Sequence, residues 1–136
     1  MANAIYPKYK EAILQSSSNS NMSSGTVKVA LVDTNDYTYS ASHDMYDDVS
    51  AAVVGTPVEI GSKTFTDGVF DGADVTLTSV SGDQSEALVI YIDTGTPSTS
   101  RLVAYIDTGV TGLPVTPNGG DITITWDNGA NKIFKL

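Results

Sequence analysis

Two copies of the tripeptide Asp-Thr-Gly are the residues of this sequence whose type and spacing most directly suggest chemistry. They begin at Asp93 and Asp107, and each follows a run of mostly apolar residues. Two carboxylates that lie a few ångströms apart and share one proton can together activate a water molecule for hydrolysis. The repeated tripeptide therefore raises the question of whether the chain is a hydrolase.

The tripeptide is similar to the signature of aspartic proteases, but its arrangement differs from theirs. In pepsin-like enzymes the two copies lie in separate lobes, whereas here they are only 14 positions apart, at 93 and 107. In retroviral-type enzymes Ala or Ser follows the tripeptide, whereas Thr96 and Val110 follow it here. If the two preceding strands pair as an antiparallel hairpin, the two aspartates lie at its opposite ends. We therefore expect no catalytic aspartate pair.

Turn formation explains these aspartates better. Four expected strands end in Asp followed by small polar residues or glycine, at Asp33, Asp93, Asp107 and Asp127. An Asp side chain at such a position accepts hydrogen bonds from backbone N–H groups two residues on, and a following Gly or Asn takes the positive-φ position. We predict that these aspartates terminate strands.

Other chemical signatures are weak. The Asp-rich runs 44–48 and 67–74 offer oxygen ligands for Ca²⁺, but they have neither the EF-hand spacing nor the repeats of calcium-binding β-rolls. The one histidine, His43, is expected to be a loop residue, and neither a Gly-x-Ser-x-Gly motif nor a phosphate-binding loop occurs. We expect neither an enzyme nor a cofactor nor a bound metal.

The composition limits the possible partners. The 136 residues include 16 acidic and 7 basic ones, for a net charge of −9, and no cysteine. Such a charge repels phosphate backbones, so nucleic-acid binding is not expected. Since no apolar run approaches about 20 residues, we expect a soluble protein with no membrane partner, made in the cytoplasm. The acidic charge serves solubility or favours a basic protein partner.

Short segments of alternating or continuous apolar character predict an all-β fold. Thr26–Asp33 and Asp121–Trp126 alternate cleanly, and Val53–Ile60 is interrupted by Gly55 and Pro57, which places it at a sheet edge. We expect an antiparallel β-sandwich of seven or eight strands, jelly-roll or immunoglobulin-like, over residues 26–136. Two hairpins are predicted, one pairing Phe65–Phe70 with Asp74–Val80 and one pairing Leu88–Ile92 with Leu102–Ile106.

Residues 1–25 are predicted to form an N-terminal arm outside this domain. Apolar residues four apart predict a short amphipathic helix over Ile5–Gln15, with Pro7 in its first turn. The Ser-rich run 15–25 predicts a flexible linker. A helix this short is marginal alone in water, so it packs either on its own domain or on a neighbouring subunit.

One strand and one loop suggest where contacts form. Leu88–Ile92 is apolar on both faces, so its second face needs a cover, which the arm or a neighbouring subunit would supply. Tyr37–Val49 shows no sustained period and is predicted to be a long loop with one helical turn near Asp44–Asp48. Loops of this length in small domains are often functional, which makes this one a candidate contact surface.

Four stretches carry a resemblance to a known family. They are the opening Met1–Ala12, the strand Thr26–Val32, the two Ile-Asp-Thr-Gly strands and the closing Gly119–Trp126. Together they are similar to a family of small virion proteins of tailed bacteriophages, and the likeness covers most of the chain. Such proteins commonly decorate or cement the head. The resemblance therefore implies a structural protein on the capsid surface, synthesised in the host cytoplasm.

That role implies particular partners. The protein would bind the major capsid protein and further copies of itself in a homo-oligomer, and its arm would clamp a neighbouring subunit. The arm residues expected to make this contact are Ile5, Tyr6, Tyr9 and Ile13.

A tail, neck or fibre component is the alternative. Such a protein would act as an adaptor or as a glycan-binding or host-binding module. Tyrosines of the long loop would then stack on sugars, namely Tyr37, Tyr39 and Tyr46.

Overall fold

The computed structural model describes residues 3–136, which form nine β-strands, one α-helix and three short 3₁₀ turns. The helix is α1 (Pro7–Leu14), and the turns are Tyr46–Asp48, Ser50–Ala52 and Thr66–Gly68. The strands are β1 (Ala4–Ile5), β2 (Thr26–Val32), β3 (Val53–Glu59), β4 (Val69–Phe70), β5 (Val75–Leu77), β6 (Ala87–Asp93), β7 (Arg101–Ile106), β8 (Ile122–Ile124) and β9 (Phe134–Lys135).

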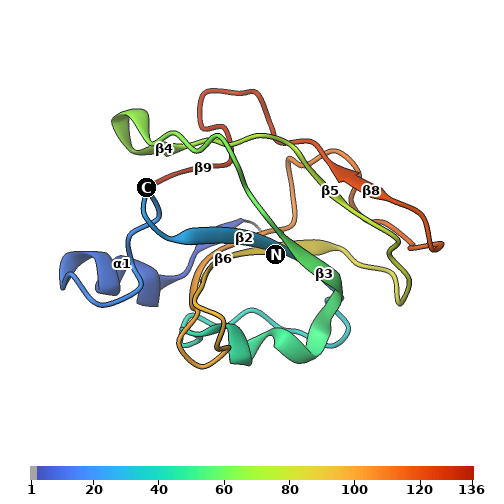
Figure 1. Ribbon diagram of the computed structural model, residues 1–136, viewed down its shortest axis with the longest axis horizontal. Coiled ribbons are helices and arrows are strands. Elements are labelled where there is room, and N and C mark those ends of the chain that lie inside the picture. Colours follow the sequence, from blue (N-terminus) through green and yellow to red (C-terminus); the bar gives the residue numbers. More distant parts are fainter. Residues whose placement is uncertain (1–2) are drawn as a thin grey trace.

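A five-stranded antiparallel sheet forms the centre of the molecule, in the order β1-β7-β6-β2-β3 (Figure 1). Strands β2 and β6 pair along their whole length, from Thr26 opposite Asp93 to Val32 opposite Ala87. Strand β3 lies at one edge, as its Gly and Pro residues predicted. The predicted antiparallel all-β class is confirmed.

Two separate two-stranded ladders, β4–β9 and β5–β8, lie on one side of this sheet (Figure 1). The predicted hairpin of Phe65–Phe70 with Asp74–Val80 is wrong, because the chain turns earlier. Thr64 and Asp71 exchange two backbone hydrogen bonds of 3.0 and 3.1 Å, so the turn falls between them. The alternating strand β5 instead pairs with the alternating strand β8, with Val75 opposite Ile124. This pairing buries the apolar side of both strands.

The chain itself covers both faces of β6. Its side chains from Ala87 to Ile92 are at most 3% exposed, although they alternate between the two faces of the sheet. On the face of Tyr91, the Tyr46 ring stacks at a centroid distance of 4.2 Å. The loop that carries Tyr46 runs on the side of the sheet away from the ladders (Figure 1). The second apolar face therefore has its cover within one chain, without a neighbouring subunit.

The N-terminal segment packs on the same sheet. Strand β1 pairs with β7, Tyr6 is fully buried, and the backbone N–H of Tyr6 donates to the Val103 carbonyl at 2.9 Å. Helix α1 begins at Pro7 instead of Ile5, because residues 4 and 5 are extended in β1. Of the two sequence alternatives, the helix packs on its own chain.

The Ser-rich segment is tied down, which corrects the expectation of a flexible linker. Lys63 Nζ donates to the carbonyl oxygens of Met22 and Gly25, at 2.7 Å each, and the Met22 side chain is buried. Arg101 donates to the Ser18 carbonyl, with Nη2 at 2.9 Å. Lys63 and Arg101, which are distant in sequence, and the buried Met22 side chain therefore hold this segment in place, although its own composition does not favour an ordered structure.

Candidate binding surfaces

The two Asp-Thr-Gly copies do not form a catalytic pair. Leu88 lies opposite Ile106 and Ile92 lies opposite Arg101, which places Asp93 and Asp107 at opposite ends of the β6–β7 hairpin, as predicted. Asp93 Oδ1 accepts a hydrogen bond from the Gly95 N–H at 3.0 Å, which is the predicted turn chemistry.

Two more of the aspartates that were predicted to terminate strands accept the same kind of hydrogen bond. Asp33 accepts from the Asn35 N–H at 2.8 Å, and Asp127 accepts from the Gly129 N–H at 3.1 Å. The end of β7 is capped differently, because Asn3 Oδ1 accepts the Asp107 N–H at 2.8 Å. These aspartates and this asparagine therefore shape turns and strand ends.

Asp93 also carries an ion pair. Its Oδ2 lies 2.8 Å from Lys28 Nζ, on the neighbouring strand β2. The hydrogen bond from Lys28, followed by that from the Gly95 N–H, holds the pKa of Asp93 below its ordinary value. The carboxylate is therefore ionised and already bonded to Lys28 and to the Gly95 N–H, which suits it to a structural role.

The depressed pKa predicts a contribution to stability that depends on pH. A carboxyl whose folded pKa lies below its unfolded value stabilises the fold above roughly pH 4 and loses that contribution as the pH falls through the folded pKa. We expect Asp93→Asn and Lys28→Gln each to remove this increment. Thermal unfolding midpoints of the three proteins from pH 6 down to pH 2 measure it. Parallel profiles for wild type and variants would contradict the prediction.

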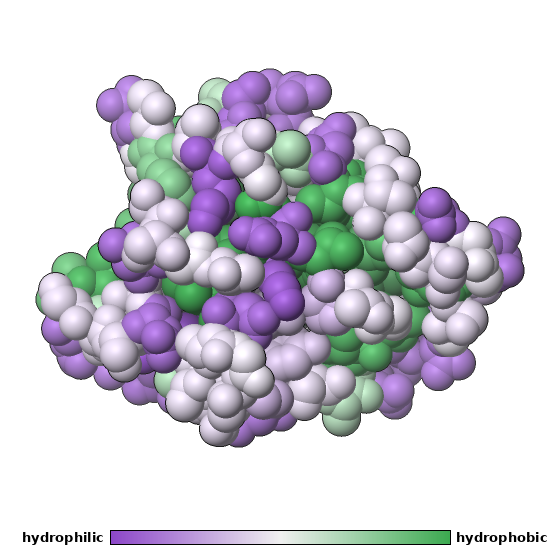
Figure 2. All heavy atoms as spheres, in the orientation of Figure 1, coloured by the Kyte–Doolittle hydropathy of each residue, from purple (hydrophilic) through white to green (hydrophobic). Residues whose placement is uncertain are grey.

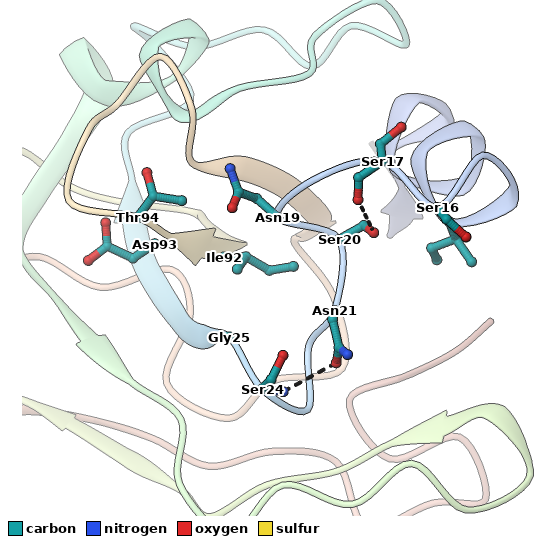
Figure 3. A pocket seen from close by; sticks show the side chains of 11 residues that line it. Ser16, Ser17, Asn19, Ser20, Asn21, Ser24, Gly25, Ile92, Asp93 and Thr94 are labelled. Carbon is teal, nitrogen blue, oxygen red and sulfur yellow. Dashed lines mark hydrogen bonds between the residues drawn. The ribbon is translucent and has the colours of Figure 1, made fainter.

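A polar pocket of about 550 Å³ lies between the Ser-rich segment and the end of β6 (Figure 3). Many of its hydrogen-bonding groups are already used. Ser20 Oγ donates to the Ser17 carbonyl at 2.7 Å, and Asn21 Oδ1 accepts the Ser23 and Ser24 N–H groups. The one carboxylate in the lining, Asp93, pairs with Lys28. The lining thus offers hydroxyls and amides but no base that is free to activate one of them.

Four tyrosines and a histidine form a cluster on the face of the central sheet that the loop with Tyr46 covers. The members of this tyrosine cluster are Tyr6, Tyr37, Tyr39, Tyr105 and His43. Tyr6 Oη lies 2.8 Å from Tyr37 Oη, which lies 2.8 Å from His43 Nδ1. Tyr39 packs against Tyr6 and Tyr105, at centroid distances of 5.1 and 5.5 Å. Burial raises the pKa of Tyr37 to about 12 and that of Tyr6 further. The phenols are therefore neutral, hydrogen-bonded core groups.

Most of the residues that were predicted to contact a partner make contacts within their own chain. Tyr6 and Tyr37 meet in the tyrosine cluster with Tyr39, while Tyr46 stacks separately on Tyr91. Tyr9 donates to the Ser20 carbonyl at 2.9 Å. Three of the predicted residues are buried, namely Tyr6, Tyr9 and Tyr37, and four are half-buried, namely Ile5, Ile13, Tyr39 and Tyr46.

An apolar groove of about 380 Å³, missed by sequence reasoning, lies between α1, residues 20–23 and the β4–β9 ladder. Phe65 and Leu136 in its lining are 38% and 57% exposed. Hydrophobic residues reach the surface at several places on this view of the molecule (Figure 2). The aromatic residues were visible in the sequence, but only the β4–β9 pairing brings Phe65 and Leu136 to one groove.

One group of acidic residues has the spacing of a metal site among the residues described. Carboxylate oxygens of Asp33, Asp36 and Asp83 all lie within 4.8 Å of one another. The two Asp-rich runs considered from the sequence form no such group within residues 3–136. Exposed acidic groups often come together without an ion, so this spacing alone assigns no metal.

No protein-family model matches the chain, and no curated protein matches it. Within residues 3–136, no helix has the length and apolar character that a membrane crossing requires.

Proposed function

We propose that the protein is a structural protein of a tailed-bacteriophage virion, which binds the outside of the capsid and stabilises it by bridging capsid subunits. It acts without catalysis, and its partners are the major capsid protein and further copies of itself. In this proposal the five-stranded sheet and the two ladders serve as the layers of a rigid β-sandwich.

The apolar groove is the observation that carries the proposal. A leucine and a phenylalanine lie half-exposed in its lining, at Leu136 and Phe65. Complete burial of such a side chain is worth about 1.5–3 kcal/mol, so contact with apolar side chains of a capsid subunit would be favourable. The groove is held by a backbone hydrogen bond of 2.9 Å from the Leu136 N–H to the Gly68 carbonyl. A preformed groove reduces the ordering cost of binding.

The net charge supports the same role. At −9, the protein would approach a basic capsid surface faster than a neutral protein of equal size. The arm mechanism expected from the sequence receives less support, because Tyr6 and Tyr9 are buried in their own chain. The proposed contact is therefore the exposed groove, whose lining includes Tyr9 and Ile13 of the packed helix α1, and not a free arm.

Co-sedimentation with capsids that lack this protein tests the proposal. We expect Leu136→Ser to weaken binding about tenfold, which corresponds to roughly 1.4 kcal/mol. Leu14→Ser is the matched control, because Leu14 is 87% exposed and lies outside the groove lining. Failure of the wild-type protein to bind would refute the function. Equal binding of Leu136→Ser and wild type would refute the groove as its contact.

The tail or fibre alternative gains no specific observation. Sugar stacking would need open aromatic faces on Tyr37, Tyr39 and Tyr46. The rings of Tyr37 and Tyr39 instead pack against Tyr105, and Tyr46 packs against Tyr91.

A further inference from the structure

The seven basic side chains of this acidic protein fall into two groups. Four bond within the chain, either to a carboxylate or to backbone carbonyl groups, namely Lys8, Lys28, Lys63 and Arg101. Within residues 3–136, the ammonium groups of the other three form no ion pair or hydrogen bond. These three lysines, Lys10, Lys132 and Lys135, all line one cleft of about 540 Å³, which we call the lysine cleft.

Both ends of the chain meet at the lysine cleft. Lys10 lies on α1, whereas Lys132 and Lys135 lie on the last segment of the chain, which contains β9. The Ile133 N–H donates to the Phe70 carbonyl at 3.1 Å, which fixes the backbone next to Lys132. Residues of β1 and β7 complete the lining. The cleft is therefore built on packed elements.

Strand β1 directs main-chain groups off the edge of the central sheet. It is the outermost strand on its side of that sheet. In an antiparallel pair, residues alternate between exchanging hydrogen bonds with the partner strand and directing their N–H and C=O groups away from it. The Tyr6 N–H donates to the Val103 carbonyl at 2.9 Å, so the preceding residue, Ile5, directs its groups outward. An extended polypeptide can pair with such an edge as an added strand.

The lining of the cleft is positively charged, although the protein as a whole is acidic. It holds three lysines against one carboxylate, that of Asp127. Charges farther away than about 8 Å are largely screened at physiological ionic strength, so the net charge of the whole chain acts only weakly inside the cleft. The lysines therefore favour carboxylates there. A nucleic acid is also negative, but its phosphate backbone has no N–H group to donate to an edge strand.

We propose that the lysine cleft binds an extended, acidic segment of a partner protein. The main chain of this segment pairs with the outer edge of β1, and its carboxylates lie against the three ammonium groups. Its other side chains contact Ile5 and Phe134, which are half-buried in the lining. If the proposed function is right, the partner is the major capsid protein, and the inference rests on that function for the partner's name alone.

An NMR titration with the peptide acetyl-Asp-Val-Asp-Val-Asp-amide tests the cleft without any capsid. We expect saturable shifts of the Ile5 and Lys135 amide signals, and slower hydrogen exchange at the Ile5 N–H. Two matched peptides should bind more weakly. One carries Asn in place of each Asp and lacks the carboxylates, and the other is N-methylated at every residue and lacks the main-chain donors.

A double variant identifies the lysines that attract the peptide. Lys10→Gln combined with Lys135→Gln should raise the half-saturation concentration about fivefold, as expected for the loss of two exposed ion pairs. Lys8→Gln is the matched control, because Lys8 also lies on α1 but bonds to Glu11 and is not in the lining. Since Lys10 and Lys135 are exposed, the double variant should keep the thermal unfolding midpoint of wild type.

Four outcomes would each overturn the inference. They are equal binding of the Asn peptide, equal binding of the N-methylated peptide, an unchanged titration of the double variant, and equal shifts with inorganic phosphate or a thymidine oligonucleotide. Capsid co-sedimentation then distinguishes the two proposals. Peptide binding without capsid binding would refute only the function, and capsid binding without a peptide response would refute only the role of the cleft.

Discussion

Replacing Tyr6 with alanine is expected to lower the free energy of unfolding by about 3–5 kcal/mol, the range typical of large aromatic truncations in protein cores. Tyr6 is 0% exposed, packs against Tyr39 and bonds to Tyr37. Its removal leaves a cavity beneath the central sheet and deletes one hydrogen bond. Urea unfolding of the purified protein, followed by tryptophan fluorescence, measures the change.

Two comparisons make this result decisive. Lys10→Ala, an exposed position on α1, should change stability by less than about 0.5 kcal/mol. Ile5→Ala should fall between the two, because Ile5 is half-buried in β1. If Tyr6 instead served as an arm residue that binds another subunit, Tyr6→Ala would leave the unfolding of the isolated protein unchanged. That outcome would contradict the packing described here.

The burial of Tyr6 also changes how the capsid proposal must be tested. Deletion of residues 1–20 would remove β1 and α1, and with them part of the core. Loss of capsid binding after such a deletion would then report unfolding as readily as a lost contact. Single substitutions at exposed positions such as Leu136 avoid this ambiguity.

The central strands were predictable because their signal lies within each strand's own sequence. The period of two in Thr26–Val32 and the continuous apolar run of β6 determine which residues are extended, whatever their partners. The turn role of Asp93 was predictable for the same reason, because an Asp side chain bonds to backbone within two residues. These features needed no knowledge of the rest of the fold.

Pairing between distant segments was not predictable from pattern. The segment Phe65–Phe70 was expected to pair with its neighbour, but β4 pairs with β9, at the far end of the chain. A sequence shows that a face must be covered without showing what covers it. The second face of β6 was expected to be covered by the arm or by a neighbouring subunit, whereas Tyr46 of a loop in the same chain stacks on Tyr91 there. The groove was missed for the same reason.

Replacing Tyr37 with phenylalanine is expected to destabilise the protein by about 1–3 kcal/mol, more than Tyr6→Phe, although each change removes one hydroxyl. When His43 Nδ1 is unprotonated, Tyr6 donates to Tyr37 and Tyr37 donates to His43, so that every proton has an acceptor. Tyr37→Phe leaves the fully buried Tyr6 hydroxyl without an acceptor. Tyr6→Phe leaves the bond from Tyr37 to His43 intact, and its expected cost is about 0.5–1.5 kcal/mol.

A double-mutant cycle tests this direction of bonding. Once Tyr37 is phenylalanine, the further change Tyr6→Phe removes the stranded hydroxyl, so the double variant should be less destabilised than the sum of the single variants by 0.5 kcal/mol or more, roughly the threshold for coupled neighbours. Tyr39→Phe is the control, because Tyr39 packs in the same cluster without belonging to the hydrogen-bonded chain. It should be nearly neutral. Additive effects of the two single changes would show that the hydroxyls are independent, since a linked chain requires that removing one changes the cost of removing the other.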